Sequence, residues 1–110
     1  MKKINILKDN RDFSRIIKST KPHKSKTFIV YLERVIDGNY QFGISVSKKI
    51  GNAVVRNKIK RQLKSIIDSK DYQKDFNCII IVTKNILNCS YQEIECELIK
   101  LFNKINIIKE

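Results

Sequence analysis

The sequence lacks acidic residues where its basic residues are densest. Between Lys48 and Lys64 there are seven Lys and Arg residues and no Asp or Glu. Residues 1–64 carry 17 Lys and Arg against 4 Asp and Glu, whereas residues 65–110 are nearly balanced. A formal net charge of +12, held in one half of a 110-residue chain, indicates a polyanionic partner such as nucleic acid or an anionic membrane.

Long apolar runs and a secretory start are also missing. No stretch approaches the roughly 18 apolar residues that span a membrane, and the basic segment lacks the Trp- and Phe-rich face of an interfacial anchor. The start, residues 1–7, is Lys-rich but has no apolar core and no cleavage site. We therefore expect a cytoplasmic protein that binds nucleic acid, with a membrane as the weaker partner.

Groups that perform catalysis or bind metal are sparse. Cys78, Cys89 and Cys96 are not at CxxC spacing, and the single His23 is far from all three, so neither a disulfide framework nor a zinc site is predicted. The acidic residues are scattered, and there is no Gly-rich phosphate loop and no Ser/His/Asp candidate. We expect no catalytic residue and no metal ligand on this chain.

Glycine and proline are rare too, with three Gly and one Pro in a chain that is 42% hydrophobic. This composition argues against disorder, and the length suits one domain over residues 1–110. Helices are predicted over 10–18 with Asp9 or Asn10 as the cap, from about 53 with Asn52 as the cap, and from 91 with a capping box at Ser90 and Glu93. Periodicity predicts strands over 27–34, 40–47 and 78–83. Residues 19–26 are expected to form a loop or a short edge strand. This order predicts an α+β fold in which helices pack on a small mixed sheet.

Alternation within the strands predicts their faces. Phe28 and Val30 point to one side and Tyr31 to the other, while Gly43 is expected to point outward. Asp37-Gly38 is typical of a hairpin turn between strands 27–34 and 40–47. The continuous apolar run over 78–83 is typical of a buried central strand.

The helix that follows Gly51-Asn52 is basic and amphipathic. Its apolar residues share one arc of a helical wheel, and its basic residues form the arc beside it. Arg56, Lys60 and Lys64 are like charges at i,i+4 spacing, which costs roughly 0.2–0.5 kcal/mol per pair. Cations also gather near the positive end of the helix dipole. Most such charge runs are simply solvated faces, but this costly arrangement favours a bound polyanion.

Two aromatic side chains are candidates for stacking on unpaired bases. Tyr31 lies on the less hydrophobic face of its strand, which favours a binding role. Phe13, on the first helix, is equally consistent with core packing.

A resemblance adds to these observations. The segment SVSKKIGNAVVRNKIKR, residues 45–61, resembles the signature of the bacterial ribonuclease P protein subunit, in which a Lys-Lys-x-Gly-Asn-Ala-Val turn leads into an Arg-Asn-Arg/Lys-x-Lys-Arg helix. A looser resemblance covers the Lys-rich start, Asp12-Phe13, strands 28–31 and 79–82, and the closing helix.

The resemblance implies an α-β-β-β-α-β-α order with a left-handed βαβ crossover. It also implies a subunit of a ribonucleoprotein endoribonuclease that removes the 5′ leader of precursor tRNA, with the active site and most of the Mg²⁺ on a catalytic RNA and no cofactor on the protein alone. The residues expected to bind RNA are Lys48, Lys49, Asn52, Arg56, Asn57, Lys58, Lys60, Arg61 and Lys64. The residues expected to form a cleft for the leader are Phe13, Ile17 and Tyr31.

This chain departs from the family pattern at three positions. Ile17 stands where the family often has an aromatic residue, which removes a stacking surface. Lys58 and Lys64 stand where Arg is frequent, which keeps the charge but loses bidentate phosphate geometry.

Two other functions remain open on the residues alone. A ribosome-associated structural protein of the same general fold would use the basic face without the aromatic cleft. A DNA-binding module would need base-reading side chains near the start of a recognition helix, for which Asn57 alone is thin support. We therefore expect RNA rather than DNA.

Overall fold

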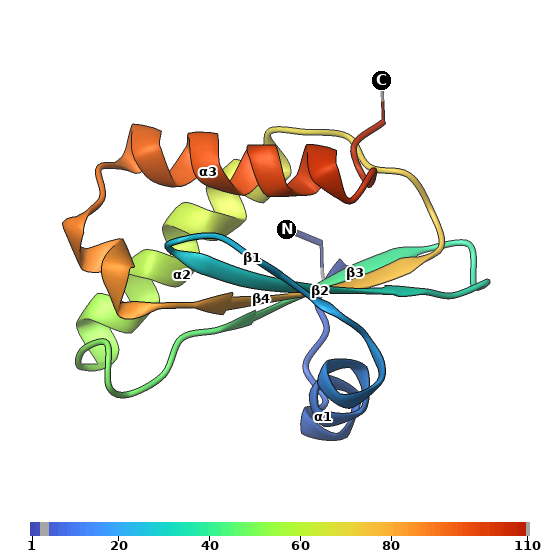
Figure 1. The fold of residues 1–110 in the computed structure, drawn as a ribbon, viewed down its shortest axis with the longest axis horizontal. Helices are drawn as coiled ribbons and strands as arrows, with labels where there is room; N and C mark the ends of the chain where they lie inside the picture. Colours follow the sequence, from blue (N-terminus) through green and yellow to red (C-terminus); the bar gives the residue numbers. More distant parts are fainter. Residues whose placement is uncertain (3–4, 110) are drawn as a thin grey trace.

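The structure is a computed structural model that describes residues 1–2 and 5–109, so Lys3 of the Lys-rich start lies outside the described residues. The elements, in order, are α1 (Asn10–Ser19), β1 (Pro22–Lys24), β2 (Phe28–Arg34), β3 (Tyr40–Ser45), α2 (Ala53–Asp68), β4 (Phe76–Val82), the 3-10 helix η2 (Lys84–Asn88) and α3 (Tyr91–Lys104). Helices α2 and α3 cover one face of the sheet, and α1 lies on the other (Figure 1). The α+β class and the order of elements are confirmed, and η2 is an addition that the sequence did not indicate.

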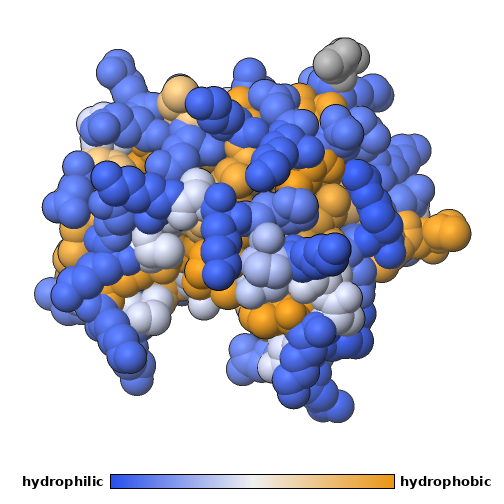
Figure 2. Space-filling view, viewed as in Figure 1, coloured by the Kyte–Doolittle hydropathy of each residue, from blue (hydrophilic) through white to orange (hydrophobic). Residues whose placement is uncertain are grey.

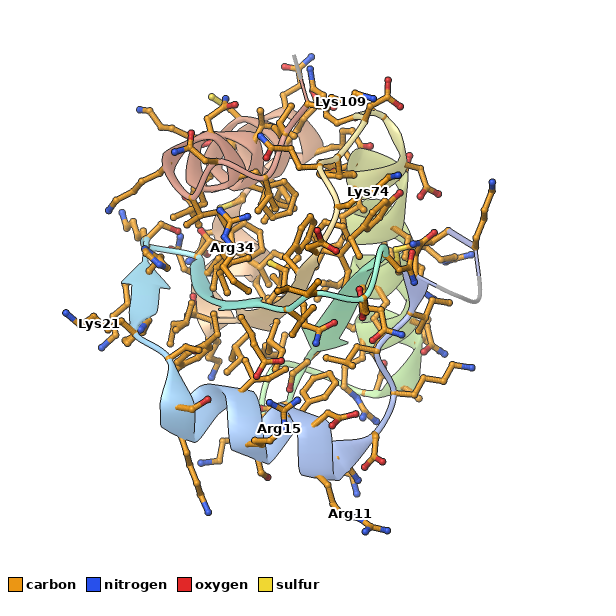
Figure 3. The ribbon with its side chains drawn as sticks, turned by 90° about the vertical axis from the view of Figure 1, so that its right-hand side faces the viewer. Arg11, Arg15, Lys21, Arg34, Lys74 and Lys109 are labelled. Carbon is orange, nitrogen blue, oxygen red and sulfur yellow. The ribbon has the colours of Figure 1, made fainter. Side chains whose placement is uncertain are left out.

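The four strands form one mixed sheet in the order β1-β2-β4-β3. Strand β4 is antiparallel to β2 and parallel to β3, so it is central, as its apolar run predicted. Figures 1 and 3 together show that α2 crosses above the sheet and that the β3–α2–β4 connection is left-handed. This is the rare hand for such a connection, and it agrees with the crossover that the resemblance implied.

The predicted hairpin is wrong, because β4 lies between β2 and β3 and keeps them from pairing. Gly38 does turn the chain, with φ at 74°. The connection is held by Asp75, just before β4, whose carboxylate accepts hydrogen bonds from the backbone N–H groups of Asp37 and Gly38 at 3.2 and 2.7 Å. A turn signal is local and carries no information about a strand that enters later in the chain.

The larger core fills the space between the sheet and the pair α2 and α3. Phe28, Phe42, Phe76 and Phe102 are fully buried there, and the rings of Phe42 and Phe76 meet edge to face with centroids 5.5 Å apart. Helix α2 contributes Ile59, Leu63, Ile66 and Ile67, which are four of the five residues on the predicted apolar arc, and the fifth, Val55, is half-buried against the core. The predicted amphipathic packing of α2 is therefore confirmed.

A smaller apolar cluster lies between α1 and the opposite face of the sheet. Its buried members are Leu7, Ile16 and Ile79, and Tyr31 packs against them from β2, on the face opposite Phe28 as predicted. Gly43 was expected to point outward, yet it is buried. The reason is that α1 covers this face, which makes both faces of the sheet apolar.

Side-chain caps set where the helices begin. Asp9 accepts a hydrogen bond from the Arg11 N–H at 2.8 Å, and Asn52 accepts one from the Val55 N–H at 3.0 Å. Ser90 and Glu93 form the predicted capping box, and the hydrogen bond from the Ser90 backbone N–H lowers the pKa of the Glu93 carboxyl. These satisfied N–H groups explain why the predicted helix starts agree with the structure.

Replacement of Asp75 tests how the β2–β3 connection is held. Asp75 has φ at 69°, a left-handed conformation that Asn tolerates and Ala does not. We expect Asp75→Ala to lower the free energy of unfolding by about 1–3 kcal/mol, because two N–H groups lose their acceptor. Asp75→Asn keeps an acceptor oxygen and should cost much less. Urea denaturation of both variants measures the difference, and equal losses would contradict this role.

Candidate nucleic-acid interface

Helix α2 presents its basic arc to solvent because its apolar arc is held in the core. Asn57, Lys58 and Arg61 are exposed, whereas Arg56, Lys60 and Lys64 are half-buried along their apolar stems. The preceding turn adds the exposed Lys48 and Lys49. Asn52, which follows this turn, caps the start of α2. The nine residues expected to bind RNA thus lie on one helix and the turn that leads into it.

None of the cations of this surface forms an ion pair with the described residues of the protein. Among residues 1–2 and 5–109, the recorded ion pairs join Asp68 to the Met1 ammonium and Arg15 to Asp12 and Glu33. The first turn of α2 contains no acidic residue. The Nε–H of Arg56 is buried and has no acceptor among the described residues. A buried donor on a cation is costly unless an acceptor from outside reaches it.

A groove of about 360 Å³ runs between α1 and α2 along the edge of β3. Phe13 of α1 lies on one side, and Lys60 and Lys64 of α2 lie on the other. Lys8 also lines the groove, ahead of α1. The groove is therefore lined by an aromatic ring and by several ammonium groups, a combination that many proteins use to bind single-stranded nucleic acids.

A second hollow lies under the sheet, between α1 and the turn that joins β3 to α2. Figure 2 shows a notch on the lower surface between two projecting groups of hydrophilic side chains. The strand register places Ser45, Ile81 and Ile29 side by side across β3, β4 and β2 on this face of the sheet, and all three are half-buried. Two half-buried isoleucines, Ile29 and Ile81, thus lie on the same face of the sheet as Tyr31.

The three residues expected to form the leader cleft come together in the cluster under α1. Phe13, Ile17 and Tyr31 are all half-buried and pack against the same buried side chains. The ring of Phe13 packs on the sheet and also borders the groove, so its role in stacking stays a prediction. The structure thus brings the aromatic candidates and the basic helix to adjacent positions.

Gly43 is a residue that sequence reasoning missed. A Cβ atom at this position would lie 2.4 Å from Cζ of Phe13, so the ring rests directly on the backbone of β3. A glycine inside a strand pattern is the signal that marks such a close approach. Lys8 was also missed, and no feature of its sequence context distinguishes it from the other lysines.

Metal-binding groups do not gather anywhere in the described part of the chain. No set of three or more His, Cys, Asp or Glu side chains lies close enough to hold an ion there. Cys78 is buried, which raises the pKa of its thiol, while Cys89 is half-buried and Cys96 is exposed. None of the helices in residues 1–2 and 5–109 has the length and apolar composition to cross a membrane.

The fold and the site define a small α+β protein whose unpaired cationic helix lies beside an aromatic groove. The family model for Ribonuclease P matches residues 1–106. The ribonuclease P protein component of Mycoplasma mobile is 40% identical over 111 residues, covering 100% of this chain and 97% of the relative. That of Bacillus cereus is 39% identical over 109 residues, covering 94% and 93%.

Solved structures agree with the sequence comparisons. The RNase P protein of Staphylococcus aureus superposes with a TM-score of 0.85 at 29% identity, covering 96% of this chain and 98% of that one. The RNase P protein of Thermotoga maritima superposes with a TM-score of 0.80 at 26% identity, covering 89% and 94%. This chain belongs to the ribonuclease P protein family.

The contact between Gly43 and Phe13 can be tested by enlarging the glycine. We expect Gly43→Ala to lower the free energy of unfolding by about 1–3 kcal/mol, because the new methyl group overlaps the ring. Phe13→Leu removes the overlapping atoms, so adding it to Gly43→Ala should cost less than the sum of the two single changes. Urea denaturation of the four proteins measures this coupling. Additive losses would show that the ring does not rest on Gly43.

Proposed function

We propose that this chain is the protein subunit of a ribonuclease P ribonucleoprotein. It binds a catalytic RNA and the 5′ leader of precursor tRNA, and it assists the cleavage that produces the mature 5′ end. The observation that carries this proposal is the set of seven cations from Lys48 to Lys64, which have no ion-pair partner in the described chain. Membership in the ribonuclease P family supports RNA as the polyanion.

The catalytic RNA binds along the basic arc of α2. Lys48, Lys49 and Arg56 surround the start of the helix, where its dipole adds to their positive potential. The buried Nε–H of Arg56 donates to a phosphate oxygen and so gains the acceptor that the protein does not supply. Lys58 and Lys64 act as point charges, which attract phosphate without the paired geometry of a guanidinium.

The leader of the precursor tRNA lies beside α1. Tyr31 and Phe13 provide aromatic faces on which unpaired bases stack. Ile17 offers apolar packing only, so the site has less stacking surface than one with an aromatic residue there. Lys60 and Lys64 line the groove next to Phe13, so the catalytic RNA that they bind lies beside the leader.

Hydrolysis of the phosphodiester takes place on the RNA, which is supported by the lack of a metal-binding cluster among the described side chains. Mg²⁺ ions, held mainly by the RNA, supply an activated water. The protein works in the cytoplasm, with precursor tRNA as substrate and with neither DNA nor membrane as a partner. Its contribution is affinity for the substrate and reduction of charge repulsion between two RNA molecules.

Reconstitution tests the proposed activity. The protein is mixed with the catalytic RNA of its own ribonuclease P and with precursor tRNA at low Mg²⁺, where RNA alone is inefficient because phosphate repulsion is poorly screened. We expect cleavage at the mature 5′ end to be faster with the protein than without it. Unchanged cleavage would refute the proposal, and cleavage by protein alone would place the active site on this chain.

Removal of two charges from α2 tests the RNA-binding surface. We expect Arg56→Ala with Lys60→Ala to weaken binding of the catalytic RNA and to reduce the slope of log K against log salt by about 0.7–0.9 for each phosphate that the variant no longer neutralises. The matched control removes two cations from the outer side of α3, Lys100→Ala with Lys104→Ala, and should leave the slope unchanged. Equal slopes in both double variants would make the basic arc of α2 a solvated face.

A further inference from the structure

A network of three polar side chains joins α1 to the sheet. Arg15 of α1 donates hydrogen bonds to both carboxylate oxygens of Glu33 on β2, to Oε1 at 3.2 Å. Asn77 of β4 donates from Nδ2 to the same Oε1 at 3.0 Å. Glu33 and Asn77 are direct partners in the β2–β4 register. One carboxylate therefore links a helix and two strands that are far apart in the sequence.

This network differs from an ordinary surface ion pair in its burial. The Glu33 side chain is 14% exposed and Asn77 is 8% exposed, while Arg15 is half-exposed. The hydrogen bonds from Arg15 lower the pKa of the Glu33 carboxyl, and the bond from Asn77 lowers it further, so the carboxylate stays ionised at neutral pH. A two-point contact between a guanidinium and a fixed carboxylate defines both distance and orientation.

The network also includes an unfavourable feature. Oδ1 of Asn77 is buried and has no hydrogen-bond partner among the described residues. An apolar residue at this position would avoid that cost and would extend the apolar cluster under α1. Stability alone therefore does not explain Asn77, whereas the need to hold the Glu33 carboxylate in one place does.

The position of the network relates it to the leader site. Glu33 is two residues from Tyr31 on the same face of β2, and Arg15 lies between Phe13 and Ile17 on α1. Figure 3 shows Arg15 reaching from α1 toward the sheet. Phe13, Ile16 and Ile17 hold α1 by apolar contacts, which are non-directional and allow the helix to roll or slide. The charged network supplies the direction that these contacts lack.

We propose that Arg15, Glu33 and Asn77 are positioning residues that fix the placement of α1 over the sheet and so set the shape of the leader site. This inference rests on the proposed function, in which Phe13, Ile17 and Tyr31 bind the leader. Arg15 and Asn77 each contact Glu33, and none of the three is placed against the substrate. Their loss should therefore alter discrimination for the leader and not the docking of the catalytic RNA on α2.

The test uses the protein assembled with its catalytic RNA and two substrates, a precursor tRNA with a leader of several nucleotides and the same tRNA without one. The ratio of the two affinities is the leader preference. We expect Glu33→Gln to reduce this preference by about tenfold, with the affinity for the leaderless tRNA unchanged. Arg15→Lys keeps the positive charge but loses the two-point contact with the carboxylate, so its leader preference should lie between those of the wild type and Glu33→Gln. Exchange of the pair, Arg15→Glu with Glu33→Arg, should restore part of the preference.

Arg34→Gln is the matched control. Arg34 follows Glu33 in β2 and donates to the carbonyl oxygen of Ile105 at 3.1 Å, at the end of α3 on the other face of the sheet. Its loss should lower stability without changing the leader preference. All measurements are made under conditions in which circular dichroism shows that each variant is folded. If Glu33→Gln does not fold, the leader preference of Arg15→Lys tests the positioning role in its place.

The outcomes separate this inference from the function on which it rests. A wild-type protein with no leader preference would refute the leader site and the positioning role together. A wild-type preference that Glu33→Gln and Arg15→Lys both retain would overturn the positioning role alone. Parallel losses for both substrates, as in a merely destabilised protein, would overturn it as well.

Discussion

The arrangement of this protein depends on the burial of β4. Residues 76–80 are all buried, and the strand is paired on both edges. A strand with apolar side chains on both faces needs cover on both sides, because an uncovered face would leave large apolar surface in water. This requirement places α2 and α3 on one face and α1 on the other. The space between α1 and α2, where the candidate site lies, is a consequence of covering the sheet from two sides.

Helix α2 combines packing with charge, and the magnitudes explain why both are tolerated. Like charges at i,i+4 cost roughly 0.2–0.5 kcal/mol per pair. Burial of an Ile or Leu side chain contributes about 1.5–3 kcal/mol, and α2 buries Ile59, Leu63, Ile66 and Ile67. The core therefore holds an electrostatically unfavourable helix in place. Its cations remain available for a polyanion because no acidic residue in the described chain pairs with them.

Helix α1 is held more lightly and in a more specific way. It covers a small apolar cluster rather than the main core, and its closest approach to the sheet requires the absence of a side chain at Gly43. The Arg15–Glu33–Asn77 network adds a directional contact at its edge. Under the proposed function, a defined placement of α1 would limit the ordering required when the leader binds.

The sequence by itself determined the features that depend on near neighbours. The caps at Asp9, Asn52 and Ser90, the amphipathic arc of α2 and the alternation in β2 follow from local hydrogen bonds and periodicity, and the structure agrees with each. The basic helix and its family signature could also be identified from the sequence, because charge and motif spacing are properties of one continuous segment. The position of Tyr31 on the side of its strand opposite Phe28 could be predicted from alternation, but its meeting with Phe13 under α1 was implied by the resemblance alone and not by any local pattern.

Only the tertiary structure decided which strands pair and what lies against the outer face of the sheet. Asp37-Gly38 indicated a hairpin, yet β4 separates the two strands, because the energy of burying an apolar strand between them exceeds that of a local turn. The same insertion brings Asn77 beside Glu33, and the docking of α1 buries Gly43 and supplies Arg15. These contacts join residues distant in the chain, and no local pattern encodes which distant partner will arrive.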